Sequence, residues 1–310
     1  MKMDRRDFMM KAFWLSVAAQ APSALSPLLA QEKSVPALKA KIPSSGETLL
    51  RVGLGTYRTF DIRGDRGKRK ELAAVLKAFV DRGGTLLDTS PMYGSAETAV
   101  GELAEETGVN EKLFLATKVW TEGRGRGIEQ MNQSLKLLKR KKIELMQIHN
   151  LLDWKTHLPT LREWKEQGRI RYIGLTHYTA DAFGELERII VREPIDFLQI
   201  PYSMRDTSAE KSLIPAAARK GVAVIANEPF GAGTLFGPTK GKPVPAWAQE
   251  IGITSWAQFF LKYILAVNDI QFAIPATGSV AHLLDNMKAA YGTLPSPAQR
   301  ERMRKDFAAL

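Results

Sequence analysis

The sequence lacks cysteine and has only four histidines. Without a thiol, the protein cannot form a disulfide, a thiolate nucleophile or a zinc site with cysteine ligands. The histidines, at positions 149, 157, 177 and 282, form no close pair on one strand or helix. Because metal-dependent hydrolases usually supply such a pair, that class is weakly supported and no metal is predicted.

The chain has a net positive charge, and its basic residues are dispersed along the sequence. Its 310 residues include 44 Lys and Arg against 33 Asp and Glu, a formal net charge of +11. The basic residues are spread over segments with helical periodicity, so we interpret them mainly as solvated helix faces, with a modest gain for anionic ligands such as phosphates. No basic-aromatic stripe accompanies them, and no nucleic-acid partner is predicted.

The first thirty residues have the features of an export signal. Arg5 and Arg6 precede Phe8 and Lys11, and a moderately apolar run follows over residues 12–30. This run is too short, and too broken by prolines, to span a bilayer stably. The paired arginines make the segment similar to a twin-arginine signal, with an ordinary amphipathic helix as the alternative.

We therefore predict a twin-arginine (Tat) signal peptide over residues 1–30, cleaved after residue 30 or residue 21, and one barrel domain over residues 31–310. The export machinery would be a partner of the N-terminus, and the location would be periplasmic. The absence of cysteine suits a compartment in which thiols oxidise.

Eight short apolar segments recur at a steady spacing along the rest of the chain. Each is bounded by glycine, proline or charged residues and precedes a segment with helical periodicity. They begin at residues 51, 85, 113, 143, 170, 197, 222 and 271. Eight such repeats favour an α/β fold, a closed (β/α)8 TIM barrel, over a doubly wound open sheet. An N-terminal hairpin, with its turn at residues 44–46, is expected to cap the bottom of the barrel.

Polar residues mark the ends of neighbouring strands, where the site of such a barrel lies. Asp88 ends the second predicted strand, Lys118 the third and His149 the fourth, while Tyr93 follows Asp88 in the next loop. Taken singly, each has a structural explanation: a helix cap, a snorkelling lysine, a satisfied core histidine or a packed tyrosine. Together they indicate proton chemistry, because a buried charge is tolerated only when it is paired.

An ion pair between Asp88 and Lys118 would place a cation close to Tyr93. That cation is expected to lower the pKa of the Tyr93 phenol and ease release of its proton. His149 would orient the oxygen that Tyr93 protonates. Such a set can protonate a carbonyl oxygen while a hydride reaches the carbonyl carbon, and the hydride requires a cofactor.

The same stretches resemble the aldo-keto reductase family over residues 41–292. "LLDTSPMYGSAE" is similar to the family's Asp-x-x-x-x-Tyr-Gly motif, "ATKVW" to its lysine strand and "MQIHN" to its histidine strand. The resemblance implies an NAD(P)H-dependent reductase of aldehydes and ketones. It makes Tyr93 the general acid, Lys118 and Asp88 the groups that tune it, and His149 the orienting residue.

The resemblance also implies which residues hold the coenzyme. They come from "GLTHY", "LQIPYS", "NEPFGAGTLFG" and "IPATGSVAHLLDNM", and they are Thr176, His177, Gln199, Phe230, Gly231, Gly233, Leu235, Thr277, Gly278, Ser279, His282, Asp285 and Asn286. Ala276 and His282 stand where strong binders of the 2′-phosphate carry basic residues, so NADPH is expected with NADH as the alternative.

The implied substrate pocket has aromatic walls, which suit an apolar or aromatic aldehyde. Its residues are Tyr57, Met92, Trp120 and Trp154. Since free nicotinamide coenzyme is expected to be scarce outside the cytoplasm, the alternative function is an exported coenzyme-binding, redox-sensing module with little or no turnover. The sequence leaves the physiological carbonyl substrate, the source of reductant and the oligomeric state open.

Overall fold

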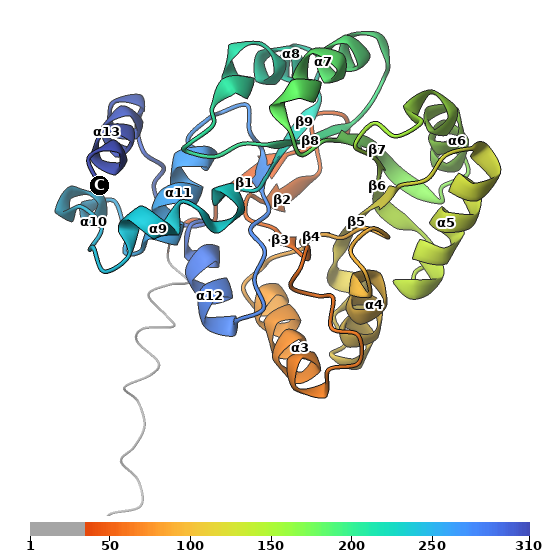
Figure 1. Ribbon diagram of the computed structural model, residues 1–310, viewed down its shortest axis with the longest axis horizontal. Helices are drawn as coiled ribbons and strands as arrows, with labels where there is room; N and C mark the ends of the chain where they lie inside the picture. The colour runs from red at the N-terminus through yellow and green to blue at the C-terminus, as the bar shows by residue number, and fades with distance from the viewer. Residues whose placement is uncertain (1–34) are drawn as a thin grey trace, which may run out of the picture. The chain divides into compact units, whose positions relative to one another are not determined.

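Eight parallel strands form the centre of the fold (Figure 1). The computed structural model describes residues 35–310, so the predicted signal peptide lies outside the described residues. Each strand pairs with the next in chain order. The strands are β3 (Leu54–Gly55), β4 (Leu86–Asp88), β5 (Phe114–Val119), β6 (Ile143–His149), β7 (Ile170–Thr176), β8 (Phe197–Pro201), β9 (Ala223–Asn227) and β10 (Phe272–Ala273). All eight predicted strands are confirmed.

Backbone hydrogen bonds between the first and last strands close the sheet into a barrel. Gly53 N–H donates to the Ala273 carbonyl at 2.9 Å, and Ala273 N–H donates back to the Arg51 carbonyl at 2.9 Å. Glycine allows this close approach, because a Cβ at Gly55 would lie 2.9 Å from the carbonyl oxygen of Ile274. Closure confirms the predicted (β/α)8 barrel and excludes the doubly wound open sheet.

Helices cover the outside of the barrel (Figure 1). The first, α3, buries Leu72, Val75, Leu76 and Phe79 on one face, as the sequence periodicity predicts. The helices are α3 (Arg66–Asp81), α4 (Ala96–Glu106), α5 (Arg124–Leu137), α6 (Trp154–Glu166), α7 (Phe183–Arg192), α8 (Leu213–Arg219), α9 (Phe236–Thr239), α10 (Ala246–Glu250), α11 (Trp256–Leu265), α12 (Val280–Lys288) and α13 (Pro297–Ala308). Short 3₁₀ turns are η1 (Asn110–Lys112), η2 (Ala180–Ala182), η3 (Ser208–Lys211) and η4 (Gly231–Gly233). Within residues 35–310, no helix has the length and apolar character needed to cross a membrane.

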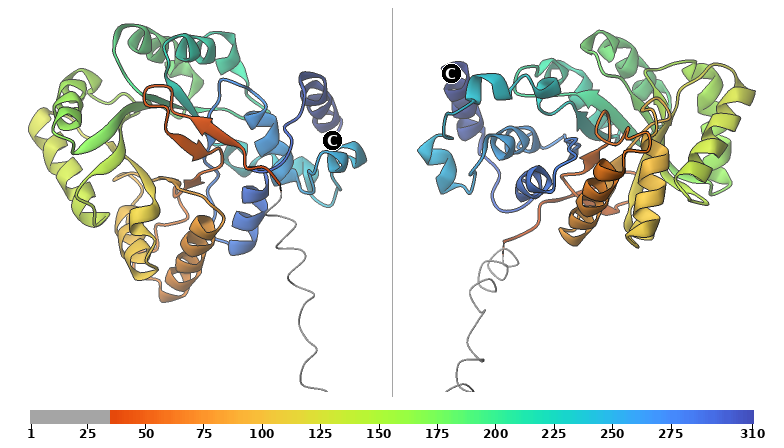
Figure 2. Two further views of the ribbon diagram at one scale, coloured as in Figure 1. Left: turned by 180° about the vertical axis from the view of Figure 1, so that it is seen from behind. Right: turned by 60° about the horizontal axis from the view of Figure 1, so that its bottom comes forward.

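The predicted hairpin is present as antiparallel strands β1 (Lys39–Lys41) and β2 (Thr48–Leu50). Figure 2 shows it lying across one end of the barrel in the view from behind. Ile42 and Leu49 are buried against the inward-facing side chains of the barrel, which include Phe114 and Phe197. The hairpin therefore closes the amino-terminal end of the barrel and leaves the carboxyl ends of the strands for the site.

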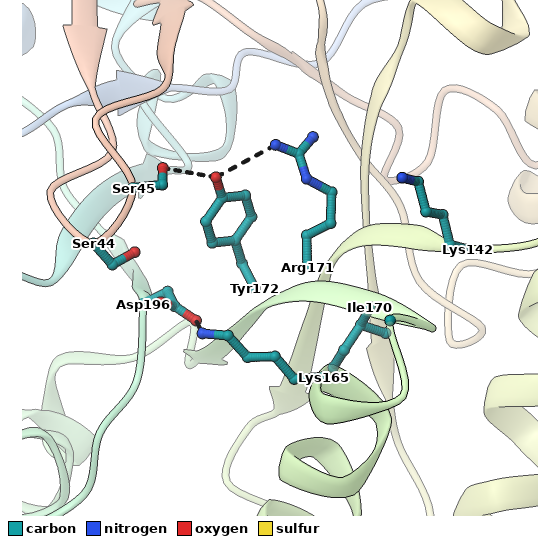
Figure 3. A pocket seen from close by; sticks show the side chains of 9 residues that line it. Ser44, Ser45, Lys142, Lys165, Ile170, Arg171, Tyr172 and Asp196 are labelled. Carbon is teal, nitrogen blue, oxygen red and sulfur yellow. Dashed lines mark hydrogen bonds and ion pairs between the residues drawn. The ribbon is translucent and has the colours of Figure 1, made fainter.

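A pocket of about 510 Å³ lies beside this hairpin (Figure 3). Its charged side chains are largely paired: Lys165 Nζ lies 2.6 Å from Asp196 Oδ2, and Arg171 forms an ion pair with Glu47 of the hairpin. Tyr172 donates to Glu47 Oε2 at 2.6 Å, and its hydroxyl oxygen lies 2.7 Å from Ser45 Oγ. Since Ile170 begins β7, the pocket lies at the amino-terminal end of the barrel, opposite the polar strand ends, and belongs to the docking of the hairpin.

Candidate active site

Asp88 and Lys118 form the ion pair that the sequence predicts. Lys118 Nζ donates to the two carboxylate oxygens of Asp88 at 2.9 and 2.8 Å and to the Thr89 carbonyl at 2.7 Å. The side chain of Lys118 is fully buried, and Asp88 is 3% exposed. The pair is adjacent because β4 and β5 are neighbours and both side chains follow the same inward-facing alternation.

Two glutamines complete the shell of donors around Asp88. Gln147 Nε2 lies 3.1 Å from Asp88 Oδ1, and Gln199 Nε2 lies 2.9 Å from the same oxygen. Gln199 is one of the predicted coenzyme residues, whereas Gln147 is a site residue that was not predicted from the sequence. A signal was present, because Gln147 lies two residues before His149 in β6 and therefore shares its face. The carboxylate is held in one position by three side-chain donors from β5, β6 and β8.

Tyr93 lies above this ion pair. Lys118 Nζ is 4.9 Å from the centroid of the Tyr93 ring, so the predicted proximity is present. The expected lowering of the Tyr93 pKa is wrong: burial, and next the charge of Asp88, raise the pKa well above its ordinary value. Removal of water from the phenol outweighs the lysine, whose charge Asp88 already compensates. Tyr93 is consequently a neutral phenol at physiological pH, as a proton donor must be.

His149 lies against Tyr93 and is neutral. The two rings meet edge to face with centroids 5.8 Å apart. Burial, followed by the charge of Lys118, lowers the His149 pKa to about 3. Its Nδ1 lies 3.0 Å from the hydroxyl oxygen of Ser90, a buried contact that no sequence pattern predicts.

Two of the four predicted substrate residues flank these rings. The Tyr57 ring centroid is 5.0 Å from that of Tyr93, and the Trp120 centroid is 6.3 Å from that of His149. Both side chains are about two-fifths exposed, at 44% and 40%. Met92 adjoins Tyr93, whereas Trp154 directs its indole N–H to Glu185 on α7 at 3.3 Å. The structure therefore assembles an open aromatic wall beside Tyr93 and His149.

The predicted carboxamide ligands connect to the ion pair. Thr176 Oγ1, at the end of β7, donates to Gln199 Oε1 on β8 at 2.8 Å. The ring of His177 stacks on Tyr178 with centroids 5.5 Å apart, and its Nδ1 accepts from the Thr179 N–H at 3.1 Å. Burial lowers the His177 pKa, so the ring is uncharged near neutral pH. Thr176, His177 and Gln199 thus lie at the rim beside His149.

The loop after β9 is a compact turn whose amides are already used. The N–H groups of Gly231, Gly233 and Leu235 donate to the carbonyls of Glu228, Phe230 and Phe230. The Phe230 ring packs on Phe236 and Phe260, with centroids 5.0 and 6.4 Å away. The predicted use of these amides for a phosphate would require them to leave these bonds, and stays a prediction.

The start of α12 fits an anionic group better. Ser279 caps this helix, and Thr277 Oγ1 accepts from the Ser279 N–H at 3.1 Å. His282 is exposed in the first turn, and Gly278 is half-buried. A helix start concentrates free N–H groups and partial positive charge, which suits a phosphate. Asn286 is buried, and Asp285 accepts from Gln258 at 2.6 Å, so both are engaged within the fold.

The polar groups at this rim fit a dinucleotide. A threonine hydroxyl and a glutamine amide lie beside the tetrad formed by Asp88, Tyr93, Lys118 and His149, and a helix start follows β10. Within residues 35–310, no group of three or more His, Cys, Asp or Glu is placed to hold a metal ion.

The fold and the site define a (β/α)8 barrel with a buried tyrosine above a buried ion pair at the carboxyl ends of its strands. A family model described as "Aldo/keto reductase family" matches residues 51–300, and the chain belongs to that family. The predicted class, an NAD(P)H-dependent oxidoreductase acting on aldehydes or ketones, is confirmed at this level.

Named relatives are similar to this chain in sequence, and solved structures share its fold. The chain is 30% identical over 254 residues to methylglyoxal reductase YeaE of Escherichia coli. The alignment covers 79% of this chain and 87% of that protein. It is 28% identical over 191 residues to aldo-keto reductase YhdN of Bacillus subtilis, and spans 57% of that protein's length. An aldo-keto reductase from Klebsiella pneumoniae, in complex with NADPH, superposes with a TM-score of 0.74 at 23% identity, covering 88% of this chain and 96% of that one.

Proposed function

We propose that this protein reduces aldehydes or ketones with NADPH and that Tyr93 is the general acid. The observation that carries the proposal is the Lys118 ammonium, which Asp88 holds 4.9 Å from the centroid of the Tyr93 ring. The coenzyme assignment is supported by structural neighbours that are complexes with NADP or NADPH and by the donors at the start of α12.

The chemistry that a bound nicotinamide supplies is a hydride for the carbonyl carbon. Tyr93 gives its phenolic proton to the carbonyl oxygen, and the product is the alcohol. Lys118 stabilises the phenolate that remains, until a proton from solvent restores Tyr93. His149, neutral at physiological pH, binds the same oxygen and orients it. Tyr57 and Trp120 pack against the substrate and exclude water from its apolar side.

Export is a second part of the proposal. The Arg-Arg-x-Phe-x-x-Lys pattern that begins at Arg5 supports a twin-arginine signal, and that route carries folded proteins to the periplasm. A fusion of residues 1–34 to a reporter should be exported in wild-type cells. Export should fail when Arg5 and Arg6 are both changed to lysine, and export that persists in the lysine variant would contradict the proposal.

The function is tested by following NADPH oxidation with an aromatic aldehyde and with methylglyoxal, using the wild type and Tyr93→Phe. Loss of the proton donor should lower kcat by about 10²–10⁴. Tyr263→Phe is the matched control, because the Tyr263 hydroxyl is buried on α11 without a partner among the described residues. Equal turnover by Tyr93→Phe and the wild type would overturn the role of Tyr93. Tight NADPH binding without turnover in any variant would favour the redox-sensing module instead.

A further inference from the structure

The Ser90 hydroxyl has two contacts in the site, and they define which way it points. Ser90 Oγ lies 3.0 Å from His149 Nδ1 and accepts the backbone N–H of Met92 at 3.1 Å. The residue is completely buried, two positions after Asp88. Over residues 35–310, the hydroxyl oxygen has no further hydrogen-bond partner.

The direction of the contact with His149 follows from proton counting. A backbone N–H only donates, so Met92 occupies a lone pair of the Ser90 oxygen and leaves the hydroxyl proton free. Among residues 35–310, His149 Nδ1 is the only acceptor that contacts the Ser90 hydroxyl. In the reverse arrangement, with Nδ1 as donor, the Ser90 proton would be buried without a partner, which is costly.

The neutral imidazole of His149 carries a single ring proton. If Nδ1 accepts from Ser90, that proton is on Nε2. Nε2 makes no hydrogen bond to the described part of the chain, and the ring meets Tyr93 edge to face. An N–H on Nε2 is therefore available to an oxygen that Tyr93 also contacts.

We propose that Ser90 is a positioning residue: its hydroxyl holds His149 in the tautomer with the proton on Nε2, so that this N–H binds the carbonyl oxygen. The catalytic consequence rests on the proposed reductase function. The tautomer itself does not depend on that function, since the contact between Ser90 and His149 sets it in the absence of substrate.

The tautomer is measured by nitrogen-15 NMR of the full chain with labelled histidine, at pH 7. His149→Asn identifies the resonances of His149 among those of the four histidines. The wild type should show Nε2 protonated and Nδ1 bare, and Ser90→Ala should show a substantial population with the proton on Nδ1. A wild type with Nδ1 protonated, or a Ser90→Ala spectrum identical to that of the wild type, would overturn the proposal.

Kinetics give the second measurement. Ser90→Ala should lower kcat by about five- to tenfold, the effect of one neutral hydrogen bond, with little change in KM. Ser90→Thr, which keeps the hydroxyl, should retain most of the activity. Thr160→Val removes another buried hydroxyl without a partner in the described structure, on α6, and should leave kcat unchanged.

The failures of the two proposals are distinguishable. A wild type that reduces no aldehyde but shows the expected tautomer would contradict the reductase function and support the positioning of His149 by Ser90. An active wild type together with an equally active Ser90→Ala variant would contradict the role of Ser90 alone. Unfolding midpoints of Ser90→Ala and Thr160→Val separate a loss of stability from a loss of catalysis.

Discussion

Gln199 bridges Asp88 and the predicted coenzyme residues. Its Nε2 donates to Asp88 Oδ1 at 2.9 Å, while its Oε1 accepts from Thr176 at 2.8 Å. The same amide therefore holds the carboxylate of the ion pair and the hydroxyl expected to meet the carboxamide. One side chain inside the barrel consequently connects the buried ion pair to Thr176, a predicted coenzyme residue.

The ion pair should dominate both stability and activity. Asp88→Asn leaves the Lys118 ammonium buried without a carboxylate, and breaking such a pair costs about 3–5 kcal/mol of unfolding free energy. Activity should be lost as well. Urea unfolding measures the loss, with Asp81→Asn in the exposed Lys77–Asp81 pair as the matched control without a measurable effect. The double variant Asp88→Asn with Lys118→Met should regain stability but not activity. A single variant as stable as the wild type would contradict the importance of the pair.

His149 should make stability depend on pH in the acid range. Its folded-state pKa of about 3 lies below the ordinary value of 6.5, so the unfolded chain binds the extra proton between these pH values. The contribution to stability is fully present above pH 6.5 and is lost as pH falls toward 3. His149→Asn should therefore show a shallower fall of unfolding free energy in this window, by up to about 1.4 kcal/mol per pH unit. His282→Asn, at an exposed position, is the control; identical slopes for His149→Asn and the wild type would refute the shift.

Gly94 should tolerate no side chain, because the turn after Tyr93 packs on Asp61. Gly94 has a φ of +63°, and a Cβ there would lie 2.5 Å from the Asp61 carboxylate. Gly108 has a similar φ of +68° with no atom near its Cβ position. Gly108→Ala should cost about 1 kcal/mol for backbone strain, and Gly94→Ala should cost more and also lower kcat. Thermal unfolding compares the two, and equal losses would show that the Asp61 contact does not matter.

The coenzyme preference should respond to charge at the start of α12. His282→Arg adds a permanent cation with a planar fork that suits a phosphate, so affinity for NADPH should rise about tenfold with no change for NADH. Fluorescence titration of both coenzymes measures the ratio. His282→Gln is the uncharged control, and an equal gain for NADH would place the 2′-phosphate elsewhere.

Much of the fold could be predicted from local pattern. The alternation of apolar runs and helical periods located the eight strands, and α13 begins with Ser296 as its cap and Pro297 at its first position, a pattern typical of helix starts. The tetrad was also readable, because a charge at the end of a buried strand must find a partner and the barrel brings neighbouring strand ends together. Positions at or just after the ends of predicted strands were enough to select four residues, without any distances: Asp88, Lys118, Tyr93 and His149.

The sequence by itself determined the strands, the hairpin and the residues that meet at the rim, since these depend on periodicity and on unpaired buried charge. Only the tertiary structure decided the closure of the barrel, the convergence of Gln147 and Gln199 on one carboxylate oxygen, and the contact between Ser90 and His149. It also reversed the expected pKa shift of Tyr93. The reason is physical: desolvation and hydrogen-bond direction depend on which atoms surround a group, and residues far apart in the chain supply those atoms.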